Sequence, residues 1–307
     1  MKLLWNPART APCVLVLGMF DGVHRGHQKL LMTGDALSER YGVPLNVYTF
    51  EPHPLERIRP ELAPPLLTTL PERAALMASF GVNNFCVADF TPSMRDQTPE
   101  EFLAEVMKRY QPKAIVCGFN YTFGAGGRGN GALLEGWGRE NGVEIAIVPS
   151  VELGGSTVSS TRIRGLLQNG RVHEAVVLMG HGYRVTGEVI HGKGLGHALG
   201  YPTANVAFHP RKLLPAFGVY SCWLQTRDRC WPAVVNVGSH PTLPEGDPVT
   251  VEAHALTDED LQLYGEHARV TFLEMLRAER TFASTAELKA QLDADAARAR
   301  AYFATLE

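Results

Sequence analysis

Two histidines, His24 and His27, lie in a glycine-containing stretch, residues 18–27, which follows an apolar run at 13–19. The apolar run predicts a buried strand, and the spacing of apolar residues over 28–41 predicts a helix. The start of a helix presents free N–H groups and a positive dipole end, and both attract anions. Two imidazoles at this point can stabilise charge on phosphate oxygens. The stretch therefore supplies a candidate catalytic pair, His24 and His27, and candidate phosphate-binding residues, namely Gly18, Phe20, Asp21 and Gly26.

The histidine pair has two other interpretations, which are unrelated surface histidines and a metal site. Metal binding is the weaker of these, because no third His, Cys or carboxylate stands at ligand spacing. The order of strand, glycine, histidine pair and helix favours phosphate binding.

Hydroxyl and guanidinium groups gather at a second predicted helix start, near residue 160. Backbone N–H groups, hydroxyls and guanidinium forks together suit a polyphosphate. An ordinary helix cap would explain the serines but not their occurrence in the same chain as the histidine stretch. The candidate phosphate-binding residues here are Ser159, Ser160, Thr161, Arg162 and Arg164.

A glycine-rich stretch over 192–205 carries the third set of candidates. Its glycines allow the backbone to wrap a phosphate chain, and Gly192, Gly194 and Gly196 are the candidate contacts. Thr203 and Asn205 offer a hydroxyl and an amide oxygen two residues apart, and hard oxygen ligands of this kind suit Mg²⁺. A flexible loop with a turn is an equally good interpretation of the composition alone.

The elements that must position these residues change in character near residue 182. Before it, predicted strands alternate with predicted helices, which is typical of a doubly wound parallel sheet of the Rossmann type. After it, strands are separated by Gly and Pro, which is typical of an antiparallel β-barrel or sandwich. Ser284 and Glu287 form a capping box for one C-terminal helix. The sequence thus predicts an α/β domain at 1–182 and an all-β domain with a terminal helix at 183–307.

Composition limits the classes of function. The chain has 307 residues, 29 Lys and Arg against 32 Asp and Glu, and a net charge of −3. Neither predicted domain has the basic excess of a nucleic-acid-binding protein, so a small nucleotide is expected instead. The five cysteines show no CxxC spacing, and no run reaches the ~18 apolar residues of a membrane span. These features predict a soluble, cytoplasmic protein.

The histidine stretch and the 159–164 stretch together resemble the adenylyltransferase domain of bacterial bifunctional riboflavin kinase/FAD synthetases. Residues 49–54 and 118–124 resemble the loops on the flavin side of that domain, and the resemblance implies flavin binding by His53, Asn120 and Phe123. Met19 departs from the family pattern, which usually has Asn at this position.

The second domain resembles riboflavin kinase in three stretches, 200–205 (GYPTAN), 236–242 and 250–265. Carried over, Glu252 is the general base for the 5′-hydroxyl of riboflavin, and a carboxylate is suited to that task. His254 shares strand parity with Glu252 and is expected to be a packing residue. His197 and His240 are further departures from the family pattern.

The resemblance implies an enzyme that makes FMN from riboflavin and ATP and then FAD from FMN and a second ATP, with Mg²⁺ as cofactor. Its partners are these small molecules, with no nucleic acid or membrane, and the oligomeric state is not predicted. Two alternatives are a nucleotidyltransferase for another acceptor and a flavin-binding module without catalysis. Glu252, Thr203 and Asn205 argue against the first, and the intact histidine and 159–164 stretches argue against the second.

Overall fold

The computed structural model describes residues 1–192, 200–239, 249–259 and 261–306. The strands are β1 (Lys2–Trp5), β2 (Cys13–Leu17), β3 (Leu45–Phe50), β4 (Asn84–Ala88), β5 (Pro112–Gly118), β6 (Glu144–Val148), β7 (Glu152–Leu153), β8 (Ser156–Thr157), β9 (Tyr183–Ile190), β10 (Ala204–Val206), β11 (Gly218–Gln225), β12 (Cys230–Gly238), β13 (Thr250–Ala255) and β14 (His267–Ala278). The helices are α1 (Arg25–Tyr41), α2 (Pro54–Ile58), α3 (Leu70–Ser79), α4 (Pro92–Asp96), α5 (Pro99–Tyr110), α6 (Gly131–Asn141), α7 (Ser160–Gln168), α8 (Val172–Met179) and α10 (Thr285–Phe303), with short 3-10 turns η1 (Pro60–Leu62) and η2 (Ala125–Gly127).

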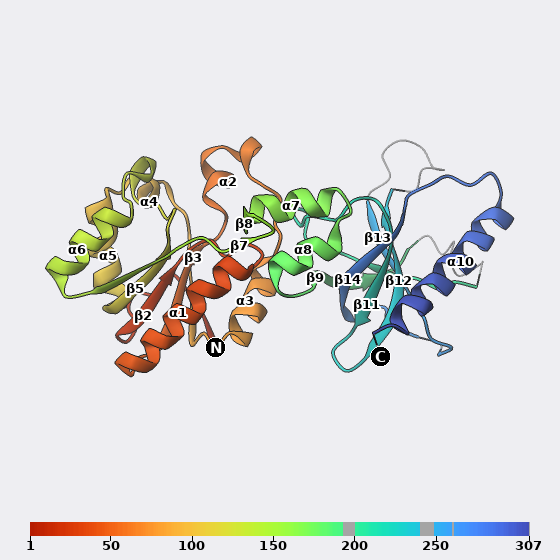
Figure 1. Ribbon diagram of the computed structural model, residues 1–307, viewed down its shortest axis with the longest axis horizontal. Helices are drawn as coiled ribbons and strands as arrows, with labels where there is room; N and C mark the ends of the chain where they lie inside the picture. The colour runs from red at the N-terminus through yellow and green to blue at the C-terminus, as the bar shows by residue number, and fades with distance from the viewer. Residues whose placement is uncertain (193–199, 240–248, 260, 307) are drawn as a thin grey trace. The chain divides into compact units, whose positions relative to one another are not determined.

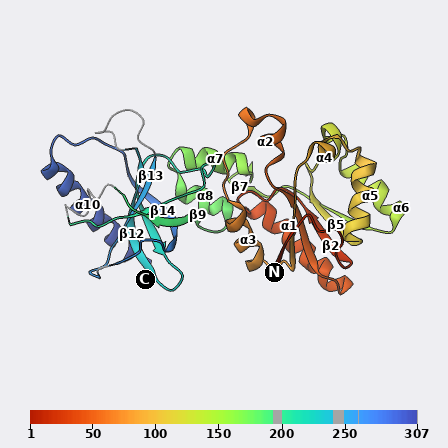
Figure 2. The same cartoon turned by 180° about the vertical axis from the view of Figure 1, so that it is seen from behind.

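Six parallel strands form the sheet of the first part, in the order β1–β4–β3–β2–β5–β6 (Figure 1). Successive residues of β2 face opposite sides, as the strand period requires. Val14 and Val16 belong to the core shared with α1 and α3, whereas Leu15 and Leu17 belong to the core shared with α5 and α6. These four helices are labelled in Figure 2. The predicted doubly wound parallel sheet is therefore confirmed.

The strand order reverses at β2. The chain adds β3 and β4 on one side of β2, and it later adds β5 and β6 on the other side. In sheets of this kind, ligands bind outside the carboxyl ends of the strands at the reversal. The loops at that position are residues 18–24 after β2 and residues 119–124 after β5. Both loops contain residues that the sequence singles out.

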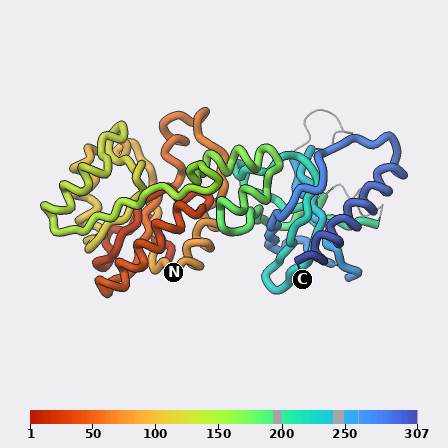
Figure 3. Tube along the Cα trace, viewed as in Figure 1, coloured from red at the N-terminus to blue at the C-terminus, as the bar shows by residue number. Residues whose placement is uncertain are grey.

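The second part contains a closed barrel of antiparallel strands in the order β10–β13–β12–β11–β14–β9, with β9 also paired to β10. Alternate residues of β13 are buried, as Val251 and Ala253 are, while Glu252 and His254 are only half-buried. The helix α10 follows β14, and its Ala299 packs with Val219 of β11. The predicted barrel and terminal helix are confirmed. Figure 3 follows the chain through these elements by colour.

The chain divides into two compact units, Met1–Ser160 and Thr161–Glu307. The helices α7 and α8 lie largely in the second unit, where α8 packs against β14 and β9. The change of fold class at residue 182, which the sequence predicts as a domain boundary, is where the barrel strands begin, and the exact boundary stays a prediction. Within the described residues, no helix is both long enough and apolar enough to cross a membrane.

Two glycines in helices provide a test of the packing of the sheet. A methyl group on Gly34 of α1 would come within 2.6 Å of Val16 and 2.8 Å of Leu45, whereas one on Gly136 of α6 would meet only the Arg139 guanidinium, at 3.9 Å. We expect Gly34→Ala to lower the free energy of unfolding by about 1–3 kcal/mol through overpacking. Gly136→Ala should raise it by about 0.5–1 kcal/mol through helix propensity.

Denaturant unfolding of the full chain, followed by circular dichroism, measures both variants. Stabilisation by Gly34→Ala would contradict the close contact between α1 and the sheet.

Candidate functional sites

The loop after β2 is held by the segment that leads into α3. The buried Asp21 carboxylate accepts hydrogen bonds from the N–H groups of Leu67 (3.1 Å) and Thr68 (2.8 Å) and from the Thr68 hydroxyl (3.1 Å). Phe20 and Val23 have left-handed φ angles of 55° and 38°. Such angles persist only where the surroundings enforce them. Asp21 thus shapes the loop, and its predicted contact with a phosphate stays a prediction.

The two histidines of the loop are stacked, with ring centroids 3.7 Å apart and planes 14° apart. His24 is the N-cap of α1, and its Nδ1 accepts a hydrogen bond from the backbone N–H of His27 at 3.3 Å. A neutral His24 therefore carries its proton on Nε2. The Nδ1 atom of His27 is buried and has no hydrogen-bond partner among the described residues.

The pKa of the His27 imidazole lies well below its usual range. Burial of the ring is the main cause, and the nearby His24 and Arg73 lower the pKa further. His27 is therefore neutral near pH 7 in the absence of a ligand. A neutral imidazole can still donate one hydrogen bond to a phosphate oxygen.

The glycines of the loop allow its aromatic rings to approach the backbone. A methyl group on Gly26 would lie 3.1 Å from the Cε1 and Nδ1 atoms of His24, and one on Gly18 would lie 3.0 Å from the ring of Phe20. Phe20 in turn lies with its ring centroid 5.3 Å from that of His27. The predicted residues Gly18, Phe20, Gly26 and the two histidines are therefore brought together.

A buried arginine on α3, which the sequence analysis does not single out, contacts the same loop. Arg73 donates hydrogen bonds to the Met19 carbonyl (3.0 Å) and to the Glu51 carboxylate (2.8 Å). The Thr49 hydroxyl also donates to the Met19 carbonyl, at 3.2 Å. Residue 19, where the family usually has Asn, is therefore held through its backbone.

Ser160 joins the second predicted phosphate-binding stretch to this loop, because its hydroxyl donates to the Asp21 carbonyl at 2.9 Å. Ser159 directly precedes α7, and Thr161, Arg162 and Arg164 lie within the first turns of α7. Phosphate contacts of these residues stay predictions.

The three predicted flavin-binding residues lie in different environments. Asn120 is exposed directly after β5. Phe123 is buried, and its ring centroid lies 5.5 Å from that of Phe102 of α5. His53 is the N-cap of α2, where its Nδ1 accepts a hydrogen bond from the N–H of Leu55 at 3.1 Å. Asn120 is thus available to a ligand, whereas Phe123 contributes to the core, and flavin contacts stay predictions.

In the barrel, strand pairing places the candidate base, Glu252, in a row of mostly polar residues that runs across neighbouring strands. Glu252 of β13 pairs with Asn205 of β10 on one side and with Asn236 of β12 on the other. The row continues from Asn236 through Val219 of β11 to Arg277 of β14. Side chains at paired positions lie on the same face of a sheet. Glu252 is therefore flanked by two amides.

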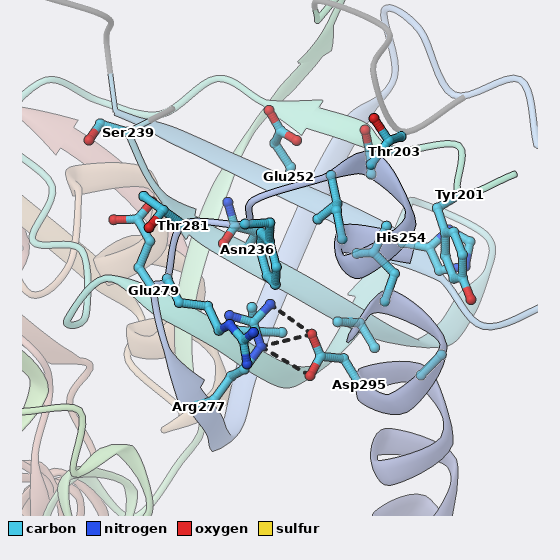
Figure 4. Close-up of a pocket in the computed structure, with 18 of the residues that line it drawn as sticks. Tyr201, Thr203, Asn236, Ser239, Glu252, His254, Arg277, Glu279, Thr281 and Asp295 are labelled. Carbon is cyan, nitrogen blue, oxygen red and sulfur yellow. Dashed lines mark hydrogen bonds and ion pairs between the residues drawn. The ribbon is translucent and has the colours of Figure 1, made fainter. Parts of the chain in front are cut away.

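This row borders a cavity of about 480 Å³ between the outer face of the barrel and α10 (Figure 4). Thr203, Asn236, Glu252 and His254 line it from the barrel, and Leu288, Leu292 and Asp295 line it from α10. The mixture of apolar residues and a few polar groups is typical of a small-molecule site.

His254 has a polar partner, contrary to the expectation that it only packs. Its Nδ1 lies 2.9 Å from the Pro202 carbonyl, and its ring is 4.9 Å from that of Tyr201. Burial lowers its pKa, the bond to Pro202 opposes this shift, and Arg300 adds to it. His254 therefore ties β13 to the stretch that contains Thr203.

An ion pair that the sequence analysis missed forms one side of the cavity. The guanidinium of Arg277 on β14 lies 2.8 Å from the carboxylate of Asp295 on α10 (Figure 4). The same carboxylate accepts a hydrogen bond from the Gln291 amide at 2.8 Å. The sequence carries a signal for this pair, because Asp295 stands at helical spacing between the apolar residues Leu292 and Ala299. An acid in that position requires a buried partner.

Part of the glycine-rich stretch is described. Gly192 lies against Asn205, since a methyl group on Gly192 would come within 2.1 Å of the Asn205 amide nitrogen. Phosphate binding by Gly194 and Gly196 is predicted for residues outside the described ranges, and so are the departures His197 and His240.

Two family models match the chain, one described as FAD synthetase over residues 6–162 and one described as riboflavin kinase over residues 179–303. Among relatives named bifunctional riboflavin kinase/FMN adenylyltransferase, that of Escherichia coli K12 is 36% identical over 293 residues, covering 95% of this chain and 93% of the relative. That of Listeria monocytogenes is 32% identical, and the match covers 96% of this chain and 93% of the relative. That of Bacillus subtilis is 31% identical, and the match covers 96% of this chain and 94% of the relative.

A crystal structure of a protein from Streptococcus pneumoniae, described as a macrolide-efflux protein, shares the fold. Its TM-score is 0.87 at 31% identity, and the match covers 98% of this chain and 99% of that chain. The matches to both family models, in the order that the sequence predicts, favour the bifunctional interpretation over its two alternatives. The chain belongs to the family of bifunctional riboflavin kinases/FMN adenylyltransferases, with the adenylyltransferase part first and the kinase part second.

Proposed function

We propose that the loop after β2 is the site of FMN adenylylation and that the cavity beneath α10 is the site of riboflavin phosphorylation. One observation carries this proposal: each predicted set of catalytic residues lies in one compact unit, and each unit corresponds to one family match. His24 and His27 belong to the first unit, and Glu252 belongs to the second.

In the first reaction site, a phosphate oxygen of FMN attacks the α-phosphorus of ATP, and pyrophosphate leaves. The stacked His24 and His27 donate hydrogen bonds to the triphosphate at the N-terminus of α1, where the helix dipole also favours negative charge. The low pKa of His27 keeps the ring neutral until a phosphate arrives, and nearby negative charge then favours its protonated form. Ser160, Thr161, Arg162 and Arg164 are proposed to hold the remaining phosphates.

In the second reaction site, the 5′-oxygen of riboflavin attacks the γ-phosphorus of ATP, and ADP leaves. Glu252 is proposed to take the proton of the attacking hydroxyl. Its neighbours Asn205 and Asn236 are neutral amides, so they can orient the carboxylate and substrate by hydrogen bonds without neutralising the base. The cavity wall of Leu288 and Leu292 suits the apolar ring system of a flavin.

We propose Mg²⁺ as the metal of the kinase site. The hydroxyl of Thr203 and the amide oxygen of Asn205 fit this ion, because Mg²⁺ prefers oxygen ligands and is usually shared with substrate phosphates. The pairing of Asn205 with Glu252 supports this proposal, because a metal held by Asn205 would lie near the candidate base. When bound, the ion would supply positive charge to the phosphates that take part in transfer.

We propose a cytoplasmic location for the protein. All five cysteines are free thiols, and four of them are buried, which suits a reducing compartment. Riboflavin, FMN and ATP are the proposed partners, and the oligomeric state is left unassigned.

Substitutions at the two sites should separate the two activities. Glu252→Ala should lower the rate of FMN formation from riboflavin by about 10²–10⁴-fold, because the general base is lost. It should still convert added FMN to FAD. His27→Ala should lower FAD formation from FMN by about 10²–10³-fold through lost charge stabilisation and still make FMN. Chromatography of the products measures both activities.

Exposed residues of the same types supply matched controls. Glu188→Gln on β9 and His173→Ala on α8 should leave both activities unchanged. Loss of both activities in a folded Glu252→Ala or His27→Ala protein would refute the assignment of two separate sites.

The metal proposal predicts a change in the requirement for Mg²⁺. Asn205→Ala should raise the Mg²⁺ concentration for half-maximal kinase activity by about tenfold, since one of two protein ligands is removed. The control is Asn169→Ala, because Asn169 directly follows α7 and its side-chain amide donates to the Gly165 carbonyl of that helix. A Mg²⁺ titration of FMN formation measures the effect, and an unchanged midpoint would exclude Asn205 as a ligand.

A further inference from the structure

Arg73 of α3 is a buried cation in the adenylyltransferase part, with only 2% of its surface exposed. Burial of a charge is costly unless the charge is paired and hydrogen-bonded. Its partner, Glu51, lies directly after β3 and is only partly buried. The position of this pair beside the histidine loop therefore calls for a role beyond stability.

The guanidinium of Arg73 connects two loops at the carboxyl end of the sheet. One nitrogen donates to the Met19 carbonyl in the loop after β2, at 3.0 Å, and another donates to Glu51 after β3, at 2.8 Å. The planar fork of an arginine can hold two acceptors in fixed directions, which the single ammonium of a lysine does not do. The Nε atom is buried and has no partner among the described residues.

The contact at Met19 bears directly on the catalytic pair. Met19 is followed by Phe20 and Asp21, whose conformation and hydrogen bonds set the path of the chain into His24. Arg73 also acts on His27 by its charge, since it is one of the two ionisable groups that lower the pKa of that ring, the other being His24. The Asp21 carboxylate is engaged by residues 67 and 68.

We propose that Arg73 is a positioning residue for adenylyl transfer: paired with Glu51, it fixes the loop that carries His24 and His27 against the loop after β3. This inference rests on the proposed site of FMN adenylylation. Arg73 acts through the Met19 carbonyl and through Glu51, and the reacting phosphates are contacted by other residues.

Three variants of the full chain separate the geometry of Arg73 from its charge. Arg73→Met removes the charge and the fork, Arg73→Lys keeps the charge without the fork, and Glu51→Gln removes the partner charge. The matched control is Arg95→Met, because Arg95 is exposed and pairs only with the adjacent Asp96 among the contacts observed. Kinase activity of the same chain and circular dichroism report on its folding.

Misplacement of catalytic groups by about 1 Å costs about 10²-fold in rate. We therefore expect Arg73→Met to lower kcat for FAD formation from FMN by about 10- to 100-fold, with FMN formation from riboflavin within about twofold of the unchanged chain. Arg73→Lys should lose most of the same activity, because the fork is lost. Arg95→Met should leave both activities unchanged. FAD formation within twofold of the unchanged chain in both Arg73 variants would overturn the proposal.

The pKa of His27, measured by NMR of histidine-labelled protein and assigned with His27→Gln, gives a second readout. Removing the positive charge in Arg73→Met should raise this pKa, whereas removing the negative charge in Glu51→Gln should lower it. Arg73→Lys should leave it nearly unchanged. Loosened packing would move the pKa in the same direction in all three variants, and that result would overturn the proposal.

Failure of Arg73→Met to fold and failure of the proposed adenylylation site can both be distinguished from failure of the positioning role. If Arg73→Met does not fold, Arg73→Lys and Glu51→Gln decide the question by rate and by pKa. If His27→Ala retains full FAD formation, the proposed adenylylation site itself is refuted, whatever the Arg73 variants show.

Discussion

The parallel pairing of β2 with both β3 and β5 is the constraint on which the adenylyltransferase part depends. It places the ends of three strands at one edge of the sheet, and the functional loops follow from those ends. The backbone groups of the loop after β2 leave the sheet ladder, so they need partners elsewhere. Arg73, Thr49 and Ser160 supply these partners for the carbonyls of residues 19 and 21. Three segments that are distant in the sequence thus contact one loop, because each donates a hydrogen bond to a backbone carbonyl of that loop.

The kinase part depends on a different constraint, the alternation of side chains across a closed barrel. Since β13 must bury Val251 and Ala253, Glu252 is forced onto the outer face. Register then brings Asn205 and Asn236 beside it, and α10 covers the face to form a cavity. The cavity therefore lies outside the barrel, and the residues buried inside the barrel are separate from the residues proposed to react.

The sequence predicts the elements with strong periodicity and misses those without it. The apolar run at 13–19 forms β2 (Cys13–Leu17), and the helical spacing over 28–41 lies within α1 (Arg25–Tyr41). The strand β1 was not predicted because it is short and mostly exposed, so it has no apolar pattern. The helix α6 contains Gly131, Gly136 and Gly138, which are weak helix formers and hide its pattern. Close contacts with Ile147 and Ile145 account for Gly131 and Gly138.

The candidate sites show the same limit. The histidine pair and Glu252 are found from local spacing and from resemblance, whereas Arg73 and Asp295 are not. Each of these two owes its role to a partner outside its own helix, Glu51 and Arg277 respectively. A local pattern can mark Asp295 as an acid among apolar residues, but it does not identify the partner of either residue.

These two pairs also explain how a chain with a net charge of −3 can handle triphosphates. In each part an arginine, buried at Arg73 and partly buried at Arg277, lies beside the candidate site, and a carboxylate balances its charge at a distance of 2.8 Å. Such an ion pair adds nothing to the net charge of the protein, but its positive and negative ends are held in a fixed orientation beside the site. The low pKa of His27 belongs to the same arrangement, because a neutral ring beside Arg73 avoids repulsion until a phosphate supplies negative charge. Nucleotide binding at the two proposed sites would therefore depend on local, oriented charge, and the overall acidity of the chain would not oppose it.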